Sequence, residues 1–323
     1  MPLFLLLLQL KRNQKIVEQP GLSFWQKMAR DWQLWALAAI PITFFILFRY
    51  LPMFGVVISF QDYKMGDSFI GLDTEWVGFK HFIRFFNNPY CWRYIKNTLA
   101  LSVLSILFTF PAGIFLALLF NEIRLKKLRS FASSVSILPH FISVVVIVAM
   151  LKNIFSVDGG LVNNVLNSFG IESIDFLGTS EWFRPLYIGS GMWSGAGYAA
   201  IVYTAAIAGI DPGLYEASKL DGANRWHRLL HITLPCLIPT IATMLILRIG
   251  NVMSVGYEKV LLMQTGATND VADILSTYTY RIGILDGQSS YAAAIGLFNS
   301  VVNLILIIVA NATSRKLTES SLW

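Results

Sequence analysis

Six long apolar stretches dominate the pattern of hydrophobic and polar positions along the chain. They lie at residues 34–60, 98–120, 131–151, 186–208, 237–262 and 291–312. Each has about 18 residues or more, which lets an α-helix cross roughly 30 Å of hydrocarbon. The stretches are continuously apolar and do not alternate, so they predict helices and exclude the strands of a membrane barrel. The pattern therefore predicts an all-α integral membrane protein with six transmembrane helices.

Composition supports the same class. Of the 323 residues, 55% are hydrophobic and only 14% are charged, and the mean hydropathy is +0.59. Soluble domains carry about 25% charged residues. The formal net charge of +6 reflects basic residues gathered on one side of the membrane, so it does not indicate a nucleic-acid partner.

The distribution of Lys and Arg over the connecting segments predicts the orientation. Fourteen of them fall on the side of both termini and nine on the opposite side. Because short cytoplasmic segments are enriched in basic residues, we expect both termini to be cytoplasmic. The N-terminal run PLFLLLL has no preceding basic region and no small-residue cleavage site, so we expect no signal peptide there.

Signals for other chemistry are weak. The chain contains no G-x-x-x-x-G-K-[ST] sequence, so we expect no ATP site of its own. Cys91 and Cys236 fall on opposite sides of the membrane and cannot pair. His227 and His231 have the spacing of metal ligands on a helix but no third ligand nearby, so a polar helix face is favoured over a zinc site. The spacing of Gly191 and Gly195 predicts close helix packing.

The longest polar interruption in the second half of the chain spans residues 209–236. Asp211 and Pro212 are typical of a helix start. Gly222 tolerates positive φ and can end that helix. A second short helix follows, with Trp226 suited to the headgroup boundary. The pattern predicts a rigid elbow that projects a short helix away from the membrane, and the alternative is an ordinary solvated loop.

The residues of this elbow resemble a known family. The pattern E-A-[AS]-x-x-D-G-A, followed by I-T-L-P, resembles the EAA loop of binding-protein-dependent ABC importer permeases. The matching residues are Glu216, Ala217, Ser218, Asp221, Gly222, Ala223 and 232–235. Ser218 replaces the second Ala of the pattern. The wider sequences YLPMFGVVISFQDY, WVGFKHFIRFF and AGIDPGLYEASKLDGANRW are similar to maltose-type sugar permeases, and within them to the branch for complex oligosaccharides, alginate oligosaccharide among them.

This resemblance implies a multi-pass subunit of the bacterial cytoplasmic (inner) membrane with the type I ABC importer permease fold. It implies alternating access, in which a sugar or oligosaccharide passes from a solute-binding protein into the cytoplasm. The expected partners are a second permease, two ATP-binding cassette subunits, the solute-binding protein and the bilayer. The chain would bind no cofactor and would not be an enzyme, since ATP and Mg²⁺ would be used by the partner ATPase.

The resemblance also assigns roles and segments. Glu216 would pair with a basic residue of the ATPase, Ala217 and Ser218 would keep the helix thin, and Gly222 would make the turn after Asp221. The expected segments are a cytoplasmic 1–33, a first transmembrane helix with periplasmic loop at 34–94, a permease core at 95–312 containing the coupling loop 209–236, and a cytoplasmic tail at 313–323.

Polar and aromatic residues within the apolar stretches are candidates for the transport pathway. An arginine at the centre of a membrane helix costs roughly 2.5–3.5 kcal/mol on insertion scales, so Arg248 is expected to face protein or the pathway. Asn251 and Tyr257 follow it, and Trp193 and Tyr198 could stack on sugar rings. The alternatives are that Arg248 pairs with an acid of the partner permease and that the aromatic residues pack within the bundle.

Three other classes of membrane protein are alternatives to a sugar permease. A permease for another class of solute would share the same loop. An ion-coupled secondary transporter would need acidic residues at membrane depth and no cytoplasmic elbow. A membrane enzyme would need a recognisable catalytic set, and the sequence has none.

Overall fold

The computed structural model describes residues 28, 30–64, 66–67 and 74–318. These residues are almost entirely helical, and the β-pairing among them is one isolated bridge between Gln61 and Trp76. The chain divides between Val56 and Val57 into two compact units, which are described separately. The N-terminal run PLFLLLL and the last five residues lie outside the described residues.

The first unit is built on the first apolar stretch. It contains α3 (Trp32–Phe45), η1 (Ile46–Tyr50) and α4 (Leu51–Met53), and η2 (Phe54–Phe60) continues across the division. Pro41 lies inside α3, and the π-helical turn η1 follows it about one helical turn later. A π-helical turn accommodates the loss of the backbone hydrogen bond that a proline cannot donate, so the helix continues past Pro41. None of the α3 side chains is buried, which suits contact with lipid.

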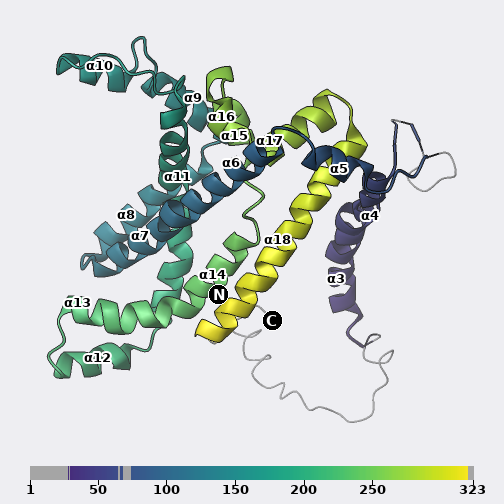
Figure 1. Ribbon diagram of the computed structural model, residues 1–323. Helices are drawn as coiled ribbons and strands as arrows, with labels where there is room; N and C mark the ends of the chain where they lie inside the picture. Colours follow the sequence, from purple (N-terminus) through teal and green to yellow (C-terminus); the bar gives the residue numbers. More distant parts are fainter. Residues whose placement is uncertain (1–27, 29, 65, 68–73, 319–323) are drawn as a thin grey trace. The chain divides into compact units, whose positions relative to one another are not determined.

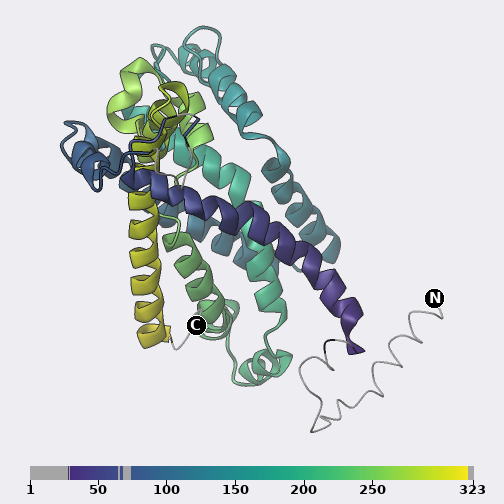
Figure 2. The same cartoon turned by 90° about the vertical axis from the view of Figure 1, so that its right-hand side faces the viewer.

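The second unit contains all remaining elements, shown in Figures 1 and 2. They are α5 (Lys80–Phe86), α6 (Cys91–Leu104), η3 (Ser105–Thr109), α7 (Phe110–Glu122), α8 (Lys126–Ile137), η4 (Leu138–Phe141), α9 (Val144–Ile154), α10 (Leu161–Ser168), α11 (Ser180–Ala208), α12 (Pro212–Leu220), α13 (Arg225–Arg228), η5 (Leu229–Thr233), α14 (Leu234–Ile249), α15 (Tyr257–Met263), η6 (Gly266–Thr268), α16 (Asn269–Ala272), α17 (Leu275–Tyr280), η7 (Arg281–Leu285) and α18 (Ser289–Thr318).

The described helices agree with six membrane crossings. Four are long and apolar enough on their own: Trp32–Phe60, Cys91–Glu122, Arg225–Ile249 and Ser289–Lys316. Two bent pairs bring the number to six if each is one span: Lys126–Phe141 with Val144–Ile154, bent by 96°, and Ser180–Ala208 with Pro212–Leu220, bent by 69°. The predicted all-α membrane architecture is therefore confirmed.

Two apolar stretches differ from simple continuous helices. The third one bends after Pro139, because Ile142 is extended and the Ser143 hydroxyl accepts a hydrogen bond from the Val146 backbone N–H, which starts α9. The fifth one ends as a helix at Ile249, and residues 250–256 separate it from α15. Turn chemistry thus divides segments that apolar character alone presents as continuous.

Helix α11 packs along α7 and α8 and also touches α14. One apolar cluster on it contains Ala117 from α7, Ala200 from α11 and Leu237 from α14. In the second unit, α12 and α13 lie at one end of these helices, and α10, α16 and α17 lie at the other, as both ribbon views show. We call these the α12 end and the α17 end.

Two glycines permit the close approach of α11 to its neighbours. A Cβ at Gly113 would lie 2.7 Å from the Ala199 Cβ, and a Cβ at Gly197 would overlap the Ser136 carbonyl. Within the described chain, the close helix packing predicted at Gly191 and Gly195 is not seen. A Cβ at Gly195 meets no atom within 4 Å, and one at Gly191 meets the Lys259 Nζ at an ordinary 3.6 Å.

This packing predicts opposite effects of the same substitution at two sites on α11. Gly197→Ala should destabilise the protein by about 1–3 kcal/mol, because backbone atoms must shift to admit the methyl group. Gly195→Ala is the control and should be neutral or stabilising by up to about 1 kcal/mol, since alanine favours the helix. The measurement is the midpoint of thermal unfolding in detergent. Equal midpoints for the two variants would contradict the packing.

Candidate functional site

The loop at the α12 end is a pair of capped helices. Asp211 starts α12 by accepting a hydrogen bond from the Gly213 backbone N–H at 2.9 Å. Gly222 has a φ of 76°, the left-handed conformation that ends a helix without a Cβ clash. Asn224 then starts α13 by accepting from the His227 N–H at 2.9 Å. The elbow predicted from the sequence is present.

The surface of α12 is open to a partner. Glu216, Ala217, Asp221 and Gly222 are exposed, and among the described residues Glu216 has no salt bridge. Leu220 is 90% exposed at the tip, which is unusual for a large apolar side chain at the polar end of a helix pair. This face therefore offers both a free carboxylate and an apolar contact.

The inner side of α12 is braced. The half-buried Ser218 hydroxyl donates to the Tyr215 carbonyl at 2.9 Å. The Tyr215 hydroxyl is 2.9 Å from the Thr233 Oγ1 in η5, the turn that leads into α14. These contacts connect α12 to η5 and α14, and residues 209–211 connect it to α11.

The two histidines of the loop lie side by side on one face of the helix. The His227 and His231 rings stack with their centroids 4.9 Å apart. Over the described residues, no group of three His, Cys, Asp or Glu side chains could hold a metal ion.

A cavity of about 710 Å³, with both apolar and polar lining residues, lies between η3, α11, α14 and α15. Its lining residues are Ser105, Thr109, Phe110, His140, Tyr187, Ile188, Gly191, Ser194, Gly195, Tyr198, Ala199, Val202, Tyr203, Met244, Leu247, Arg248, Asn251, Ser254 and Lys259. The lining contains two cationic side chains, Arg248 and Lys259, and no Asp or Glu. An anionic solute would therefore meet complementary charge.

The structure brings three of the five predicted pathway residues together. Arg248, Asn251 and Tyr198 line the cavity. Trp193 lies instead on an apolar hollow between α9 and α11. Tyr257 stacks on Tyr280, with ring centroids 5.6 Å apart, beside another hollow near α17 and α18.

The contacts of Arg248 leave its charge available. Its Nη2 donates to the Ser105 hydroxyl at 2.8 Å, and no acid of the described chain pairs with it. Ser105 belongs to η3, a π-helical turn that ends two residues before Pro111. π-Helical turns are frequent at functional sites, and Ser105 and Thr109 of this one line the cavity.

Sequence reasoning missed Lys259. Its Nζ donates to the Tyr187 carbonyl at 2.8 Å and lies 4.6 Å from the Tyr187 ring centroid. It also missed His140, whose ring stacks on Tyr198 with centroids 4.0 Å apart and planes at 9°. The sequence does contain a signal for Lys259. A lysine beside an apolar stretch is a candidate for the transport pathway for the same reason as Arg248. Nothing in the sequence indicates the stacking of His140.

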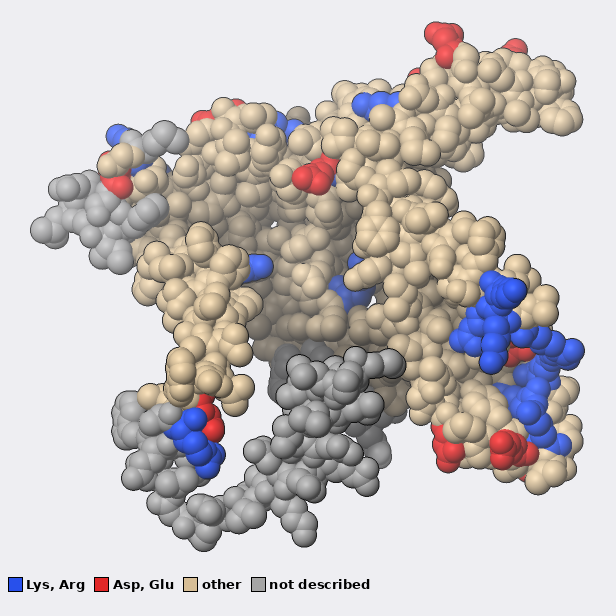
Figure 3. All heavy atoms as spheres, turned by 180° about the vertical axis from the view of Figure 1, so that it is seen from behind, with Lys and Arg blue, Asp and Glu red and all other residues tan. Residues whose placement is uncertain are grey.

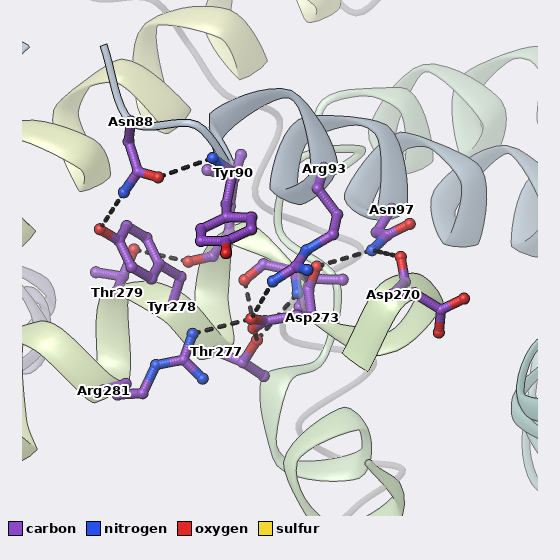
Figure 4. Close-up of polar contacts among 12 residues, drawn as sticks. Asn88, Tyr90, Arg93, Asn97, Asp270, Asp273, Thr277, Tyr278, Thr279 and Arg281 are labelled. Carbon is purple, nitrogen blue, oxygen red and sulfur yellow. Dashed lines mark hydrogen bonds and ion pairs between the residues drawn. The ribbon is translucent and has the colours of Figure 1, made fainter. Parts of the chain in front are cut away.

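A network of buried polar groups holds the α17 end together (Figure 4). Asp273, only 2% exposed, pairs with the Arg281 Nη2 at 2.9 Å and the Arg93 Nη2 at 3.7 Å. The Asn97 Nδ2 donates to the Asp273 carbonyl at 3.1 Å, and the Arg184 Nη2 donates to the Asn97 Oδ1 at 3.2 Å. The network thereby joins α6, the start of α11 and the segment around α17.

Electrostatics reinforce this network. Burial lowers the pKa of Arg281, but the hydrogen bond and charge of Asp273, together with smaller contributions from Tyr94, raise that pKa above its ordinary value. Burial, together with the hydrogen bond to Tyr291, raises the pKa of Tyr278. Both groups keep their ordinary protonation near neutral pH, so the network is a fixed anchor at this end of the helices.

The chain is similar to known membrane transport proteins. Residues 109–319 match the model of the family described as binding-protein-dependent transport system inner membrane component. The chain is 43% identical over 298 residues to the polygalacturonan/rhamnogalacturonan transport system permease protein YteP of Bacillus subtilis (strain 168), covering 92% of each protein.

Solved structures agree. A bacterial ABC transporter involved in the import of the acidic polysaccharide alginate has a chain that is 42% identical, with a TM-score of 0.83 and coverage of 91% of this chain and 99% of that one. A second structure of a bacterial alginate transporter, in complex with a periplasmic protein bound to an alginate pentasaccharide, gives 41% identity and a TM-score of 0.83 over 93% of this chain and 99% of that one. The resemblance seen in the sequence is confirmed, and the chain belongs to the family of inner membrane components of binding-protein-dependent transport systems.

Proposed function

We propose that this multi-pass inner membrane permease passes an acidic oligosaccharide through the cavity between η3, α11, α14 and α15. The observation that carries the proposal is the lining of that cavity, which holds Arg248 and Lys259 and no acid. Hydroxyls of Ser105, Ser194 and Tyr198 add groups that can bond to sugar hydroxyls. The names of the similar proteins support the same chemistry, because polygalacturonan and alginate are both polymers of uronic acids.

The energy for transport comes from a partner in this proposal. The chain has no phosphate-binding loop sequence, so ATP and Mg²⁺ would be bound by two ATP-binding cassette subunits and this chain would carry no enzymatic activity. A second permease would complete the pathway, and a solute-binding protein would deliver the oligosaccharide. The α12 end then faces the cytoplasm, as the distribution of Lys and Arg predicts.

The coupling helix would be α12. Its exposed Glu216 suits an ion pair with a basic residue of the ATPase subunit, and the small side chains of Ala217 and Ser218 suit a narrow cleft. Asp221 and Gly222 end the helix with the turn that returns the chain to α13. Closure of the two ATPase subunits on ATP would move α12 and, through η5 and the bend at residues 209–211, would move α14 and α11.

Two alternatives remain outcomes of the tests below. A permease for a neutral or different solute would not depend on the charge of the cavity. An ion pair between Arg248 and an acid of the second permease would make that arginine structural.

Removing either cation should impair uptake of charged substrate selectively. Arg248→Gln and Lys259→Gln should each lower the uptake of a uronate trisaccharide by about tenfold, which corresponds to about 1.4 kcal/mol of lost attraction. Uptake by proteoliposomes containing the assembled transporter is the measurement. Lys152→Gln is the control, because Lys152 is exposed outside the cavity. Loss of complex assembly, or no selective loss of uronate uptake, would remove the charge argument.

Removing the free carboxylate of α12 should uncouple the transporter. Glu216→Ala and Glu216→Gln should both lower substrate-stimulated ATP hydrolysis by about tenfold, since both remove one charged contact. Glu216→Asp keeps the charge and should retain part of the stimulation. Gly222→Asp should also uncouple, because a Cβ is strained at positive φ. Normal transport by Glu216→Ala or Gly222→Asp, with the complex intact, would refute the coupling role.

A further inference from the structure

The α12 end carries a concentration of positive charge that neither the cavity nor the coupling helix uses. We define the basic patch as the six residues Arg124, Lys126, Lys127, Arg129, Arg225 and Arg228. Figure 3 shows Lys and Arg side chains gathered at this end of the molecule. Four of the six are exposed and the other two are half-buried, so the charges are open to a ligand.

The two halves of the basic patch are joined in space. Arg225 Nη1 at the start of α13 lies 3.8 Å from the Glu122 carboxylate at the end of α7. Within the part of the chain that the structure describes, Glu122 is the one acid that forms a salt bridge with the basic patch. Five of its six cations are therefore without an acidic partner in the described chain.

These cations are not explained by the stability of their own helix. Lys126, Lys127 and Arg129 occupy the first turn of α8, which contains no acidic residue. The positive end of the helix dipole disfavours cations there. Cations in the first turn of α8 therefore lower the stability of the isolated chain. Bound anions would neutralise these cations and remove that cost.

Large apolar side chains lie between the cations. Leu125 is 68% exposed, Phe131 66% and Trp226 73%. Leu128 and Leu230 are also exposed. The boundary between headgroups and hydrocarbon accommodates cations and apolar side chains together.

The position of the basic patch along the spans agrees with that boundary. The span Cys91–Glu122 ends beside it, the span Arg225–Ile249 begins in it, and the bent pair starting at Lys126 begins in it. Three candidate membrane crossings thus have their polar ends at the basic patch. Clusters of four to eight basic residues next to membrane helices attract anionic lipids.

We propose that the basic patch binds the headgroups of anionic phospholipids. The negative phosphates of several lipids would neutralise the cations of α8 and α13, and the acyl chains would cover Leu125, Phe131 and Trp226. Because α13 follows directly on α12 through Gly222, bound lipid would also hold the base of that helix pair at the membrane surface. The inference concerns lipid and does not depend on which solute is transported.

The test compares lipid retention by matched variants of the assembled transporter. Purified complex is mixed with phosphatidylglycerol or phosphatidylcholine, and retained lipid is counted by native mass spectrometry. Wild type should retain phosphatidylglycerol in preference to phosphatidylcholine. Lys126→Gln/Lys127→Gln should lower that preference by about tenfold, and Lys126→Arg/Lys127→Arg should keep it.

The control is Lys96→Gln/Lys152→Gln, which removes the same number of exposed lysines outside the basic patch and should keep the preference. An equal loss in this control, or no preference in wild type, would overturn the proposal. So would release of an ATP-binding subunit by Lys126→Gln/Lys127→Gln with unchanged lipid retention, because the surface would then be a protein contact. Lipid preference without substrate-stimulated ATP hydrolysis in wild type supports the lipid site and counts against the proposed transport function alone.

Discussion

The close packing of α11 against α7 and α8 is the contact on which the rest of the second unit depends. It requires two positions without a side chain, Gly113 and Gly197, where any Cβ would collide with the neighbouring helix. Once α11 is held there, Gly191, Gly195 and Tyr198 form part of the wall of the cavity. The same helix continues through a 69° bend into α12. One long helix therefore connects the exposed loop to the cavity.

The two ends of α11 are held in different ways. At the α17 end, the Arg184 side chain bonds to Asn97, which belongs to the network around the buried Asp273. At the α12 end, Tyr203 and Ile207 are buried in the apolar cluster with Leu237, and the hydrogen bond between Tyr215 and Thr233 connects the mostly exposed loop to η5. One end of the helix is therefore held by polar contacts around the buried Asp273 and the other by apolar packing, while the loop after residue 208 is largely exposed.

Much of this could be predicted from the sequence, for physical reasons that also explain the failures. Hydrocarbon thickness sets the length of the spans, so the six stretches are recognisable, and capping chemistry predicts the start and the end of α12 through Asp211 and Gly222. A helix that is apolar on all sides carries no periodic signal for its orientation. The sequence therefore could not separate Tyr198, on the cavity, from Trp193, on another face, nor the packing Gly197 from the cavity-lining Gly195. Lys259 and Arg248 come together only because the chain breaks at residues 250–256.

The central claim is that Arg248 and Lys259 meet the carboxylates of the transported chain. The most direct measurement is a structure of the assembled transporter with a uronate oligosaccharide trapped in the membrane region. The account predicts sugar in the cavity with carboxylate oxygens about 2.7–2.9 Å from the Arg248 guanidinium and the Lys259 Nζ. An oligosaccharide bound elsewhere, with Arg248 paired to an acid of the second permease, would contradict it.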